Sequence, residues 1–169
     1  MTDTGIGLDA FDALPDTAAE NLLLSCCSSP AWARAVANGR PYGTLADLLA
    51  AADRALDALD EDEIDRALAG HPRIGDRPDN ANSAREQAAM SDADTAVRAA
   101  IAEGNRAYEA RFGHVYLVCA TGRTPAELLA ILRERLGHEP AVERRIVRTE
   151  LAEINRIRLR RLITPGAAA

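Results

Sequence analysis

Apolar residues recur every three or four positions along most of the chain, and polar residues fill the positions between them. This spacing places the apolar side chains on one face of an α-helix. One stripe follows Thr44, a second follows Pro125, and a third runs through residues 140–163. The pattern therefore predicts amphipathic helices. The apolar positions of the first two stripes are Leu45, Leu48, Leu49, Ala52, Leu56 and Leu59, and then Leu128, Leu129, Ile131, Leu132 and Leu136.

Residues that start and stop helices separate these stripes. Ser29-Pro30 and Thr124-Pro125 each place a hydroxyl directly before a proline, which is typical of the first turn of a helix, and Thr44 is the expected cap of the stripe that follows it. Glycines follow several of the stripes, as expected where a helix ends. The capping residues thus divide the chain into many short helices.

One apolar run does not fit this pattern. Val115–Ala120 is continuous and partly β-branched, which is typical of a buried strand. Because the chain offers no second strand to pair with it, we expect an irregular connector instead. We predict an all-α fold, a single compact helical domain of about eight or nine helices. It spans residues 11–163, with flexible termini at residues 1–10 and 164–169.

The composition permits one packed core and argues against two classes of partner. The chain has 169 residues, 47% of them hydrophobic, and 20 Lys+Arg against 26 Asp+Glu give a net charge of −6. An acidic protein is a poor binder of nucleic acids and anionic membranes. The sequence also shows no membrane-spanning stretch and no basic-then-apolar signal peptide. We therefore expect no nucleic-acid or membrane partner, and a cytoplasmic location.

The cysteines do not suggest a disulfide framework or a metal site. Cys26, Cys27 and Cys119 are odd in number and two of them are adjacent. There is no Cys-x-x-Cys pair, and the histidines are scattered along the chain, so zinc ligation is not indicated. We expect all three cysteines to be small buried side chains.

The richest candidate chemistry begins with residues 71–75, His-Pro-Arg-Ile-Gly. The imidazole of His71 can exchange a proton near neutral pH. A residue that precedes a proline is disfavoured in a helix, so we expect His71 on a turn after a helix that ends at Gly70. A structural helix stop would also explain this segment.

A second group follows at residues 83–87, Ser-Ala-Arg-Glu-Gln. We expect a helix from Ser83 to about Met90, on which Ser83, Glu86 and Gln87 share one face and bring a hydroxyl, a carboxylate and a carboxamide together. The same Ser-x-x-Glu spacing matches a capping box, which is structural and needs no active site. From the residues alone, both interpretations stay open.

Together the two segments resemble the pattern of the OHCU decarboxylase family, which acts on 2-oxo-4-hydroxy-4-carboxy-5-ureidoimidazoline (OHCU) in urate degradation. That pattern is a His-Pro followed, about a dozen residues later, by Ser-x-x-Glu-Gln. The resemblance continues through Phe-Gly at 112–113, Tyr-Leu-Val-Cys-Ala at 116–120 and Ile-Arg-Leu at 157–159. It covers nearly the whole chain, from Phe11 to Ile163.

The resemblance implies a decarboxylase that makes (S)-allantoin without a cofactor or metal and that forms a homodimer. It implies three catalytic residues: His71 as acid and base, Glu86 as a hydrogen-bonding carboxylate, and Arg158 as a planar fork for a ureido oxygen or carboxylate. It also implies a set of substrate-binding residues that combines the two motifs with the connector. This set is Pro72, Ser83, Ala84, Arg85, Gln87, Tyr116, Leu117, Val118, Cys119 and Ala120.

Helical periodicity separates Arg158 from its neighbours. On a wheel of about 100° per residue, it lies in register with Val147, Leu151 and Ile154. An arginine on a core-facing stripe needs a partner or must reach solvent, so a buried structural ion pair is an alternative to substrate binding. Arg161 also lies inside the apolar arc. The arginines outside it are Arg145, Arg148, Arg156 and Arg160.

Three other functions compete with this interpretation. The first is a non-catalytic helical interaction module on the same scaffold. The second is a decarboxylase of a related ureido or imidazoline substrate. The third is a metal-dependent hydrolase that uses His71, His114 and His138, which their spacing supports poorly.

Overall fold

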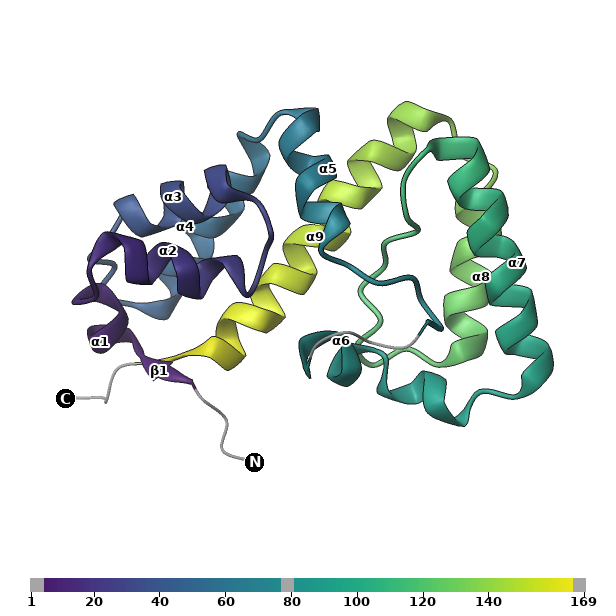
Figure 1. Ribbon diagram of the computed structural model, residues 1–169, viewed down its shortest axis with the longest axis horizontal. Helices are drawn as coiled ribbons and strands as arrows, with labels where there is room; N and C mark the ends of the chain where they lie inside the picture. Colours follow the sequence, from purple (N-terminus) through teal and green to yellow (C-terminus); the bar gives the residue numbers. More distant parts are fainter. Residues whose placement is uncertain (1–4, 77–80, 166–169) are drawn as a thin grey trace. The chain divides into compact units, whose positions relative to one another are not determined.

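The computed structural model describes residues 5–76 and 81–165 (Figure 1). Within these ranges the chain forms nine α-helices, one 3₁₀-helix and a single pair of very short strands. The predicted all-α class and number of helices are confirmed. The elements are β1 (Ile6–Gly7), α1 (Leu8–Asp12), α2 (Asp16–Leu24), α3 (Pro30–Asn38), α4 (Leu45–Asp57), α5 (Glu61–Ala69), α6 (Ala81–Glu86), the 3₁₀-helix η1 (Ala88–Asp92), α7 (Thr95–Phe112), α8 (Pro125–Arg135), α9 (Pro140–Leu162) and β2 (Ile163–Thr164).

The predicted capping residues start several of these helices. The hydroxyls of Ser29, Thr44 and Thr124 each accept a hydrogen bond from the backbone N–H three residues later, at 3.1 Å. Each bond satisfies a donor that the first turn of a helix leaves without a partner. Helices α3, α4 and α8 therefore begin where the sequence indicates.

The chain divides into two compact units, residues 1–67 with 152–169, and residues 68–151. We call them the first and the second unit. In the first unit, α3 packs against both α2 and α4 (Figure 1). Trp32 of α3 is fully buried there, and its indole Nε1 donates to the Ala52 carbonyl at 3.1 Å. Trp32 thus serves as a core residue with its one polar atom satisfied.

A short parallel pairing of β1 with β2 brings Ile6 opposite Ile163 in the first unit. Leu8, the first residue of α1, is only 1% exposed. The sequence did not indicate this pairing, because strands of two residues are too short for a period of two to be recognised.

The second unit has a core between α7 and α8. Gly104 explains how closely these helices approach, because a Cβ at this position would lie 2.6 Å from Leu132 Cδ2. A glycine inside a helix is therefore required here in spite of its low helix propensity. The buried residues of this core are Ile74, Met90, Ile101, Tyr108, Tyr116, Val118, Ala120, Leu128, Leu129 and Leu132.

The helix expected from Ser83 to Met90 is interrupted. α6 already begins at Ala81 and ends at Glu86, and η1 follows from Ala88. Gln87, between them, leaves the α-helical region with φ −103° and ψ 18°. Because Ser83 is the third residue of α6, it cannot be its N-cap. The capping-box interpretation of Ser83 and Glu86 is wrong.

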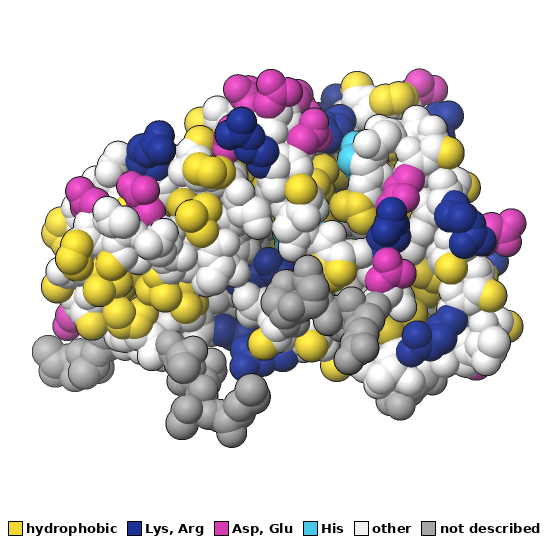
Figure 2. Space-filling view, viewed as in Figure 1, with side chains coloured by type: hydrophobic (Ala, Val, Ile, Leu, Met, Phe, Trp, Pro, Cys, Tyr) yellow, Lys and Arg dark blue, Asp and Glu magenta, His cyan; other side chains and the backbone are white. Residues whose placement is uncertain are grey.

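Basic and acidic side chains are interspersed on the face that Figure 2 shows. This mixture is typical of a solvated surface. Among the described residues, every helix is too short or too polar to cross a membrane.

Candidate active site

The segment that contains His71 leaves α5 as a turn, as predicted. The backbone N–H of His71 donates to the Leu68 carbonyl at 3.0 Å, and the side chains of His71 and Pro72 are half-buried. Four residues later, Gly75 has a φ of +90°, which only glycine adopts readily. The two ends of this turn are thus set by a proline and a glycine.

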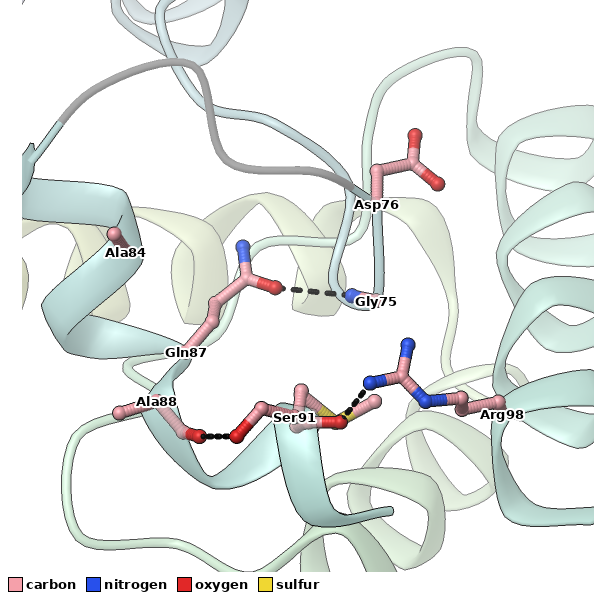
Figure 3. A pocket seen from close by; sticks show the side chains of 8 residues that line it. Gly75, Asp76, Ala84, Gln87, Ala88, Ser91 and Arg98 are labelled. Carbon is pink, nitrogen blue, oxygen red and sulfur yellow. Dashed lines mark hydrogen bonds between the residues drawn. The ribbon is translucent and has the colours of Figure 1, made fainter. Parts of the chain in front are cut away.

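The turn is tied to the Ser-x-x-Glu-Gln segment by Gln87. The side-chain Oε1 of Gln87 accepts a hydrogen bond from the backbone N–H of Gly75 at 3.0 Å. Figure 3 shows the Gln87 side chain pointing from the end of its helix toward the Gly75 backbone. Gln87 is only 8% exposed, so this bond forms largely away from water. The two sequence motifs are therefore in direct contact.

Helix α7 anchors the same turn from another side. The buried Asn105 donates through Nδ2 to the Ile74 carbonyl at 2.9 Å. Arg73 forms an ion pair with Glu109, with 2.7 Å between Nε and Oε1. Sequence reasoning missed Asn105, although its place one turn after Ile101 on the helix was a signal.

A cavity of about 510 Å³ opens beside Gln87 (Figure 3). Two predicted substrate-binding residues, Ala84 and Gln87, line it. Its wall also includes Arg98 of α7, which donates to the Met90 carbonyl. The lining residues are Gly75, Asp76, Ala84, Gln87, Ala88, Met90, Ser91 and Arg98.

The other predicted residues of helix α6 differ in their exposure to solvent. Ser83 is 1% exposed and Glu86 is 9% exposed, whereas Ala84 and Arg85 are exposed. Ser83 and Glu86 therefore share the buried face of α6, and Gln87, just beyond the end of this helix, is buried as well. Arg85, on the opposite face, has less support as a substrate-binding residue.

Val115–Ala120 carries neither helix nor strand, which confirms the expected connector. Most of its side chains are buried, but Cys119 is half-buried, so the expectation that all three cysteines are buried is wrong for this one. Arginine side chains hold two of its carbonyls. Arg135 Nη1 donates to the Leu117 oxygen at 2.5 Å, and Arg123 Nε donates to the Cys119 oxygen at 3.1 Å.

Arg135 belongs to a buried polar cluster that sequence reasoning missed. It forms an ion pair with Glu143 at 2.5 Å, and Tyr108 donates to the same carboxylate at 2.6 Å. Burial would raise the pKa of Glu143, but hydrogen bonds from Arg135, Tyr108 and His138 outweigh it and hold that pKa below its ordinary value. Burial and the bond to Glu143 raise the pKa of Tyr108.

The spacing of α8 contained a signal for this arginine. Arg135 follows Leu128 and Leu132 by seven and three residues, so it continues their face of the helix. The expected apolar stripe ended on Leu136 instead, which the structure shows half-buried.

Arg158 lies in the first unit and is buried, 4% exposed. Its Nη1 donates to the Cys26 carbonyl at 3.0 Å. Arg161 is only half-buried, so the inward position predicted for Arg158 is confirmed. Arg156 differs from its prediction, because it is half-buried and forms an ion pair with Asp53 instead of standing in solvent.

Cys27 and Asn155 are two buried residues of the first unit near Arg158. Burial raises the pKa of the Cys27 thiol, although Ser29, Asn155 and Arg158 act in the opposite direction. A neutral buried thiol is inert as a nucleophile, as the sequence suggested. Asn155, which is 3% exposed and lies one turn before Arg158, was not predicted.

The histidines do not converge in the way that a metal-dependent hydrolase requires. His138 Nδ1 contacts Glu143 Oε2 at 3.1 Å, and the His114 ring stacks with Phe112. Over residues 5–76 and 81–165, no group of three His, Cys, Asp or Glu side chains is arranged to hold a metal ion.

Comparison with known proteins agrees with the residue pattern. The sequence model of the OHCU decarboxylase family matches residues 12–160. The chain belongs to this family. A 2-oxo-4-hydroxy-4-carboxy-5-ureidoimidazoline decarboxylase of Amia calva is 30% identical over 141 residues, which cover 79% of this chain and 81% of that protein.

A second relative is longer. The uric acid degradation bifunctional protein TTL of Arabidopsis thaliana is 29% identical over 150 residues, which cover 84% of this chain but 46% of that protein. The chain thus spans about half of this bifunctional relative, and the remaining half of TTL has no counterpart in the match.

Two solved structures share the fold. A crystal structure of OHCU decarboxylase in the presence of (S)-allantoin superposes with a TM-score of 0.76 at 27% identity, covering 88% of this chain and 98% of that one. An (S)-allantoin synthase gives a TM-score of 0.73 at 18% identity, covering 94% of this chain and 54% of that one, and shows likeness of fold alone.

Proposed function

We propose that this chain decarboxylates OHCU to (S)-allantoin in urate degradation. The observation that carries the proposal is the hydrogen bond from Gly75 to Gln87, which unites the His-Pro turn with the Ser-x-x-Glu-Gln helix. Membership of the OHCU decarboxylase family supports the same reaction.

The substrate supplies its own electron sink. When the bond between the ring carbon and the carboxylate breaks, carbon dioxide leaves and the electron pair passes into the adjacent imine and carbonyl. A proton then adds to the neighbouring ring carbon that carries the ureido group, while the hydroxyl on the first carbon loses its proton and becomes a carbonyl. The chemistry needs no pyridoxal, thiamine or metal in principle, so the tasks of the protein are to bind the ring, orient the carboxylate and deliver a proton.

His71 is the group we assign to proton transfer. Imidazole is well suited to this task because its ordinary pKa lies close to a working pH near neutrality. The half-buried turn keeps His71 accessible while Pro72 restricts its backbone. A single fixed acid delivers the proton to one face of the product carbon, and the product is then a single enantiomer.

The remaining assignments concern recognition. Glu86 can hydrogen-bond the imidazole or a ring or hydroxyl group, and Gln87 offers a carboxamide to amide-like edges. Arg158 offers a fork to the ureido oxygen or a carboxylate. The connector residues 116–120 offer backbone groups and an apolar wall. These roles rest on the resemblance and on the burial of the residues concerned.

A homodimer and a cytoplasmic location complete the proposal. The resemblance to the family supports the homodimer, and light scattering of the purified protein would test it. The second activity of the bifunctional Arabidopsis relative is not part of the proposal, because the match covers 46% of that protein.

A direct assay tests the function. Freshly made OHCU is mixed with the protein, its decay is followed by ultraviolet absorbance, and the enantiomer of allantoin is read by circular dichroism. We expect faster decay than in buffer and an excess of (S)-allantoin. Unchanged decay, or racemic allantoin, would reject the proposal. Turnover of a related imidazoline in preference to OHCU would favour the alternative substrate.

A further inference from the structure

The second unit contains one fully buried ion pair that none of the assigned roles uses. Arg135 is 3% exposed and Glu143 is 0% exposed. Two charges removed from water incur a large desolvation cost, and a well-packed apolar pair is often as stable. This pair therefore needs a reason beyond stability, and the contacts of Arg135 suggest one.

The guanidinium of Arg135 divides its donors among three targets, the most distant being the Tyr108 hydroxyl, to which Nη2 donates at 3.5 Å. Nε donates to Glu143 Oε1 at 2.5 Å, while Nη1 donates to the Leu117 carbonyl at 2.5 Å. The planar fork fixes the angle between these donors, so the carboxylate determines where Nη1 points.

The carboxylate is itself held from other sides. Tyr108 donates to Glu143 Oε1 at 2.6 Å, and His138 Nδ1 contacts Oε2 at 3.1 Å. The rings of Tyr108 and Tyr116 lie within 5.8 Å and 5.0 Å of the guanidinium carbon, where they favour a cation. Arg135 is thus fixed by α7, by α9 and by the start of the connector.

Leu117 lies in the middle of the connector, between residues whose backbone groups are assigned to the substrate. We propose that Arg135 is a positioning residue for the decarboxylation, which sets the connector through the Leu117 carbonyl while Glu143 orients its guanidinium. This inference rests on the proposed function. It goes beyond it because Arg135 and Glu143 act through the connector and do not touch substrate themselves.

The variant Arg135→Lys separates positioning from charge. Lysine keeps the positive charge beside Glu143, but its single ammonium lacks the rigid fork that serves Glu143 and Leu117 at fixed angles. When a group that orients the substrate is displaced by about 1 Å, catalysis can fall by about a hundredfold. We expect KM for OHCU to rise about tenfold or more, since the connector would contact the ring before and during the reaction.

The expected split between kinetic constants is specific to positioning. Proton transfer stays with His71, so kcat should remain within about threefold of wild type and its pH profile should be unchanged. A merely structural role would instead reduce the fraction of folded enzyme, lowering apparent kcat with KM unchanged. Arg133→Lys is the matched control, because Arg133 is exposed on the same helix, and its KM should equal that of wild type.

Two results would overturn the inference while leaving the proposed function intact. One is an Arg135→Lys enzyme with the KM of wild type. The other is a KM that rises equally in Arg133→Lys. If Arg135→Lys does not fold, Glu143→Gln serves instead, because it keeps the shape of the side chain and removes the charge that orients Arg135. A raised KM then supports positioning, and an unchanged KM rejects it. An inactive wild-type protein would reject the proposed function first, and this inference with it.

Discussion

At His71, chemistry and stability can be separated, because the residue follows the end of α5 and its side chain is only half-buried. We predict that His71→Asn leaves the fold intact and lowers kcat for OHCU by about a hundred- to ten-thousandfold, the usual contribution of a general acid or base. The checks are the rate of OHCU decay and a thermal melt by circular dichroism. A well-folded variant with near wild-type turnover would remove His71 from the mechanism.

Glu86 is a buried carboxylate that does not take part in a capping box, since Ser83 lies inside α6. Glutamine has nearly the same size and still accepts a hydrogen bond, but it lacks the charge. We therefore predict that Glu86→Gln keeps the Tm close to wild type and loses most of kcat. Parallel melts and kinetics of Glu86→Gln and Glu86→Ala test this. Full activity of Glu86→Gln would leave the carboxylate with a structural role only.

Arg158 is the buried arginine of the last helix, and its Nη1 is fixed by the Cys26 carbonyl. Arg158→Lys keeps the charge but loses the planar fork of donors. Losing one hydrogen bond to a charged group costs roughly 1.5–3 kcal/mol. We predict a fall in kcat/KM of about ten- to hundredfold, mainly through a higher KM, with little change in Tm.

Arg160→Lys is the control for this experiment, because Arg160 is exposed on the same helix. Arg156→Lys would be a poor control, since the ion pair with Asp53 gives Arg156 a role of its own. If Arg158→Lys behaves as wild type and Arg161→Lys is strongly impaired, the functional arginine lies one turn later in the helix.

The arginines also show how far residue-scale prediction reaches. Periodicity alone identified Arg158 as inward, because α9 is long enough for the apolar arc to be clear. It failed for Arg156, whose partner Asp53 is distant in sequence. For Arg135 the spacing of α8 did contain a signal, but its partners lie on three other segments that local sequence does not identify. A charge that is buried by distant partners leaves only a weak mark in local sequence.

At the scale of elements, the turn from His71 to Gly75 depends on the backbone of its glycine. Gly75 has φ +90°, and an added Cβ would meet Met90 Cε at 3.6 Å and Ile101 Cγ2 at 3.8 Å, which are ordinary contacts. Gly75→Ala would therefore be strained by its backbone and not by crowding, at about 1–2 kcal/mol. We predict that it lowers the free energy of unfolding by that amount and also lowers kcat/KM, because the bond to Gln87 is disturbed.

Gly43→Ala is the matched control for the Gly75 experiment. Gly43 has φ +75° with nothing within 4 Å of an added Cβ, so it carries the same backbone strain away from the His-Pro turn. Urea unfolding should show similar losses of stability for both variants, while only Gly75→Ala lowers kcat/KM. Equal values of kcat/KM for the two variants would show that the geometry of the His-Pro turn does not affect catalysis.

Element boundaries followed from the sequence wherever a local signal defines them. Hydroxyl caps placed the starts of α3, α4 and α8, and the lack of a pairing strand predicted the irregular connector. The break between α6 and η1 was missed. It lies at Gln87, whose side chain bonds to Gly75, so it is associated with a contact that helical propensity does not encode.

On the scale of the whole molecule, the all-α class followed from periodicity, and the family followed from motifs spread along the chain. Neither signal could reveal the pairing of Ile6 with Ile163, because it joins segments at opposite ends of the sequence. The cluster of Arg135, Glu143 and Tyr108 was not predicted either, because it assembles only when α7, α8 and α9 pack.

That cluster makes the stability of the protein depend on pH in a predictable direction. Burial of Glu143 favours its neutral form, but hydrogen bonds from Arg135, Tyr108 and His138 favour the carboxylate more strongly, so its pKa in the folded state lies below the ordinary value of 4.5. A lowered pKa means that the unfolded chain takes up the proton more readily than the folded one. The carboxylate therefore stabilises the fold at pH values above its unfolded pKa. This contribution is lost as the pH falls through the pKa of the folded state.

We predict that Glu143→Gln lowers the free energy of unfolding most at neutral pH, where the carboxylate of the wild type is fully charged. As the solution is acidified, wild type loses this contribution and the variant has none to lose, so the difference between them should shrink. Urea unfolding curves of both proteins over a series of pH values between about 7 and 3 measure this difference. A difference that stays constant across the series would show that Glu143 contributes through packing alone. A difference that grows in acid would show that the pKa of Glu143 is raised in the folded state and not lowered.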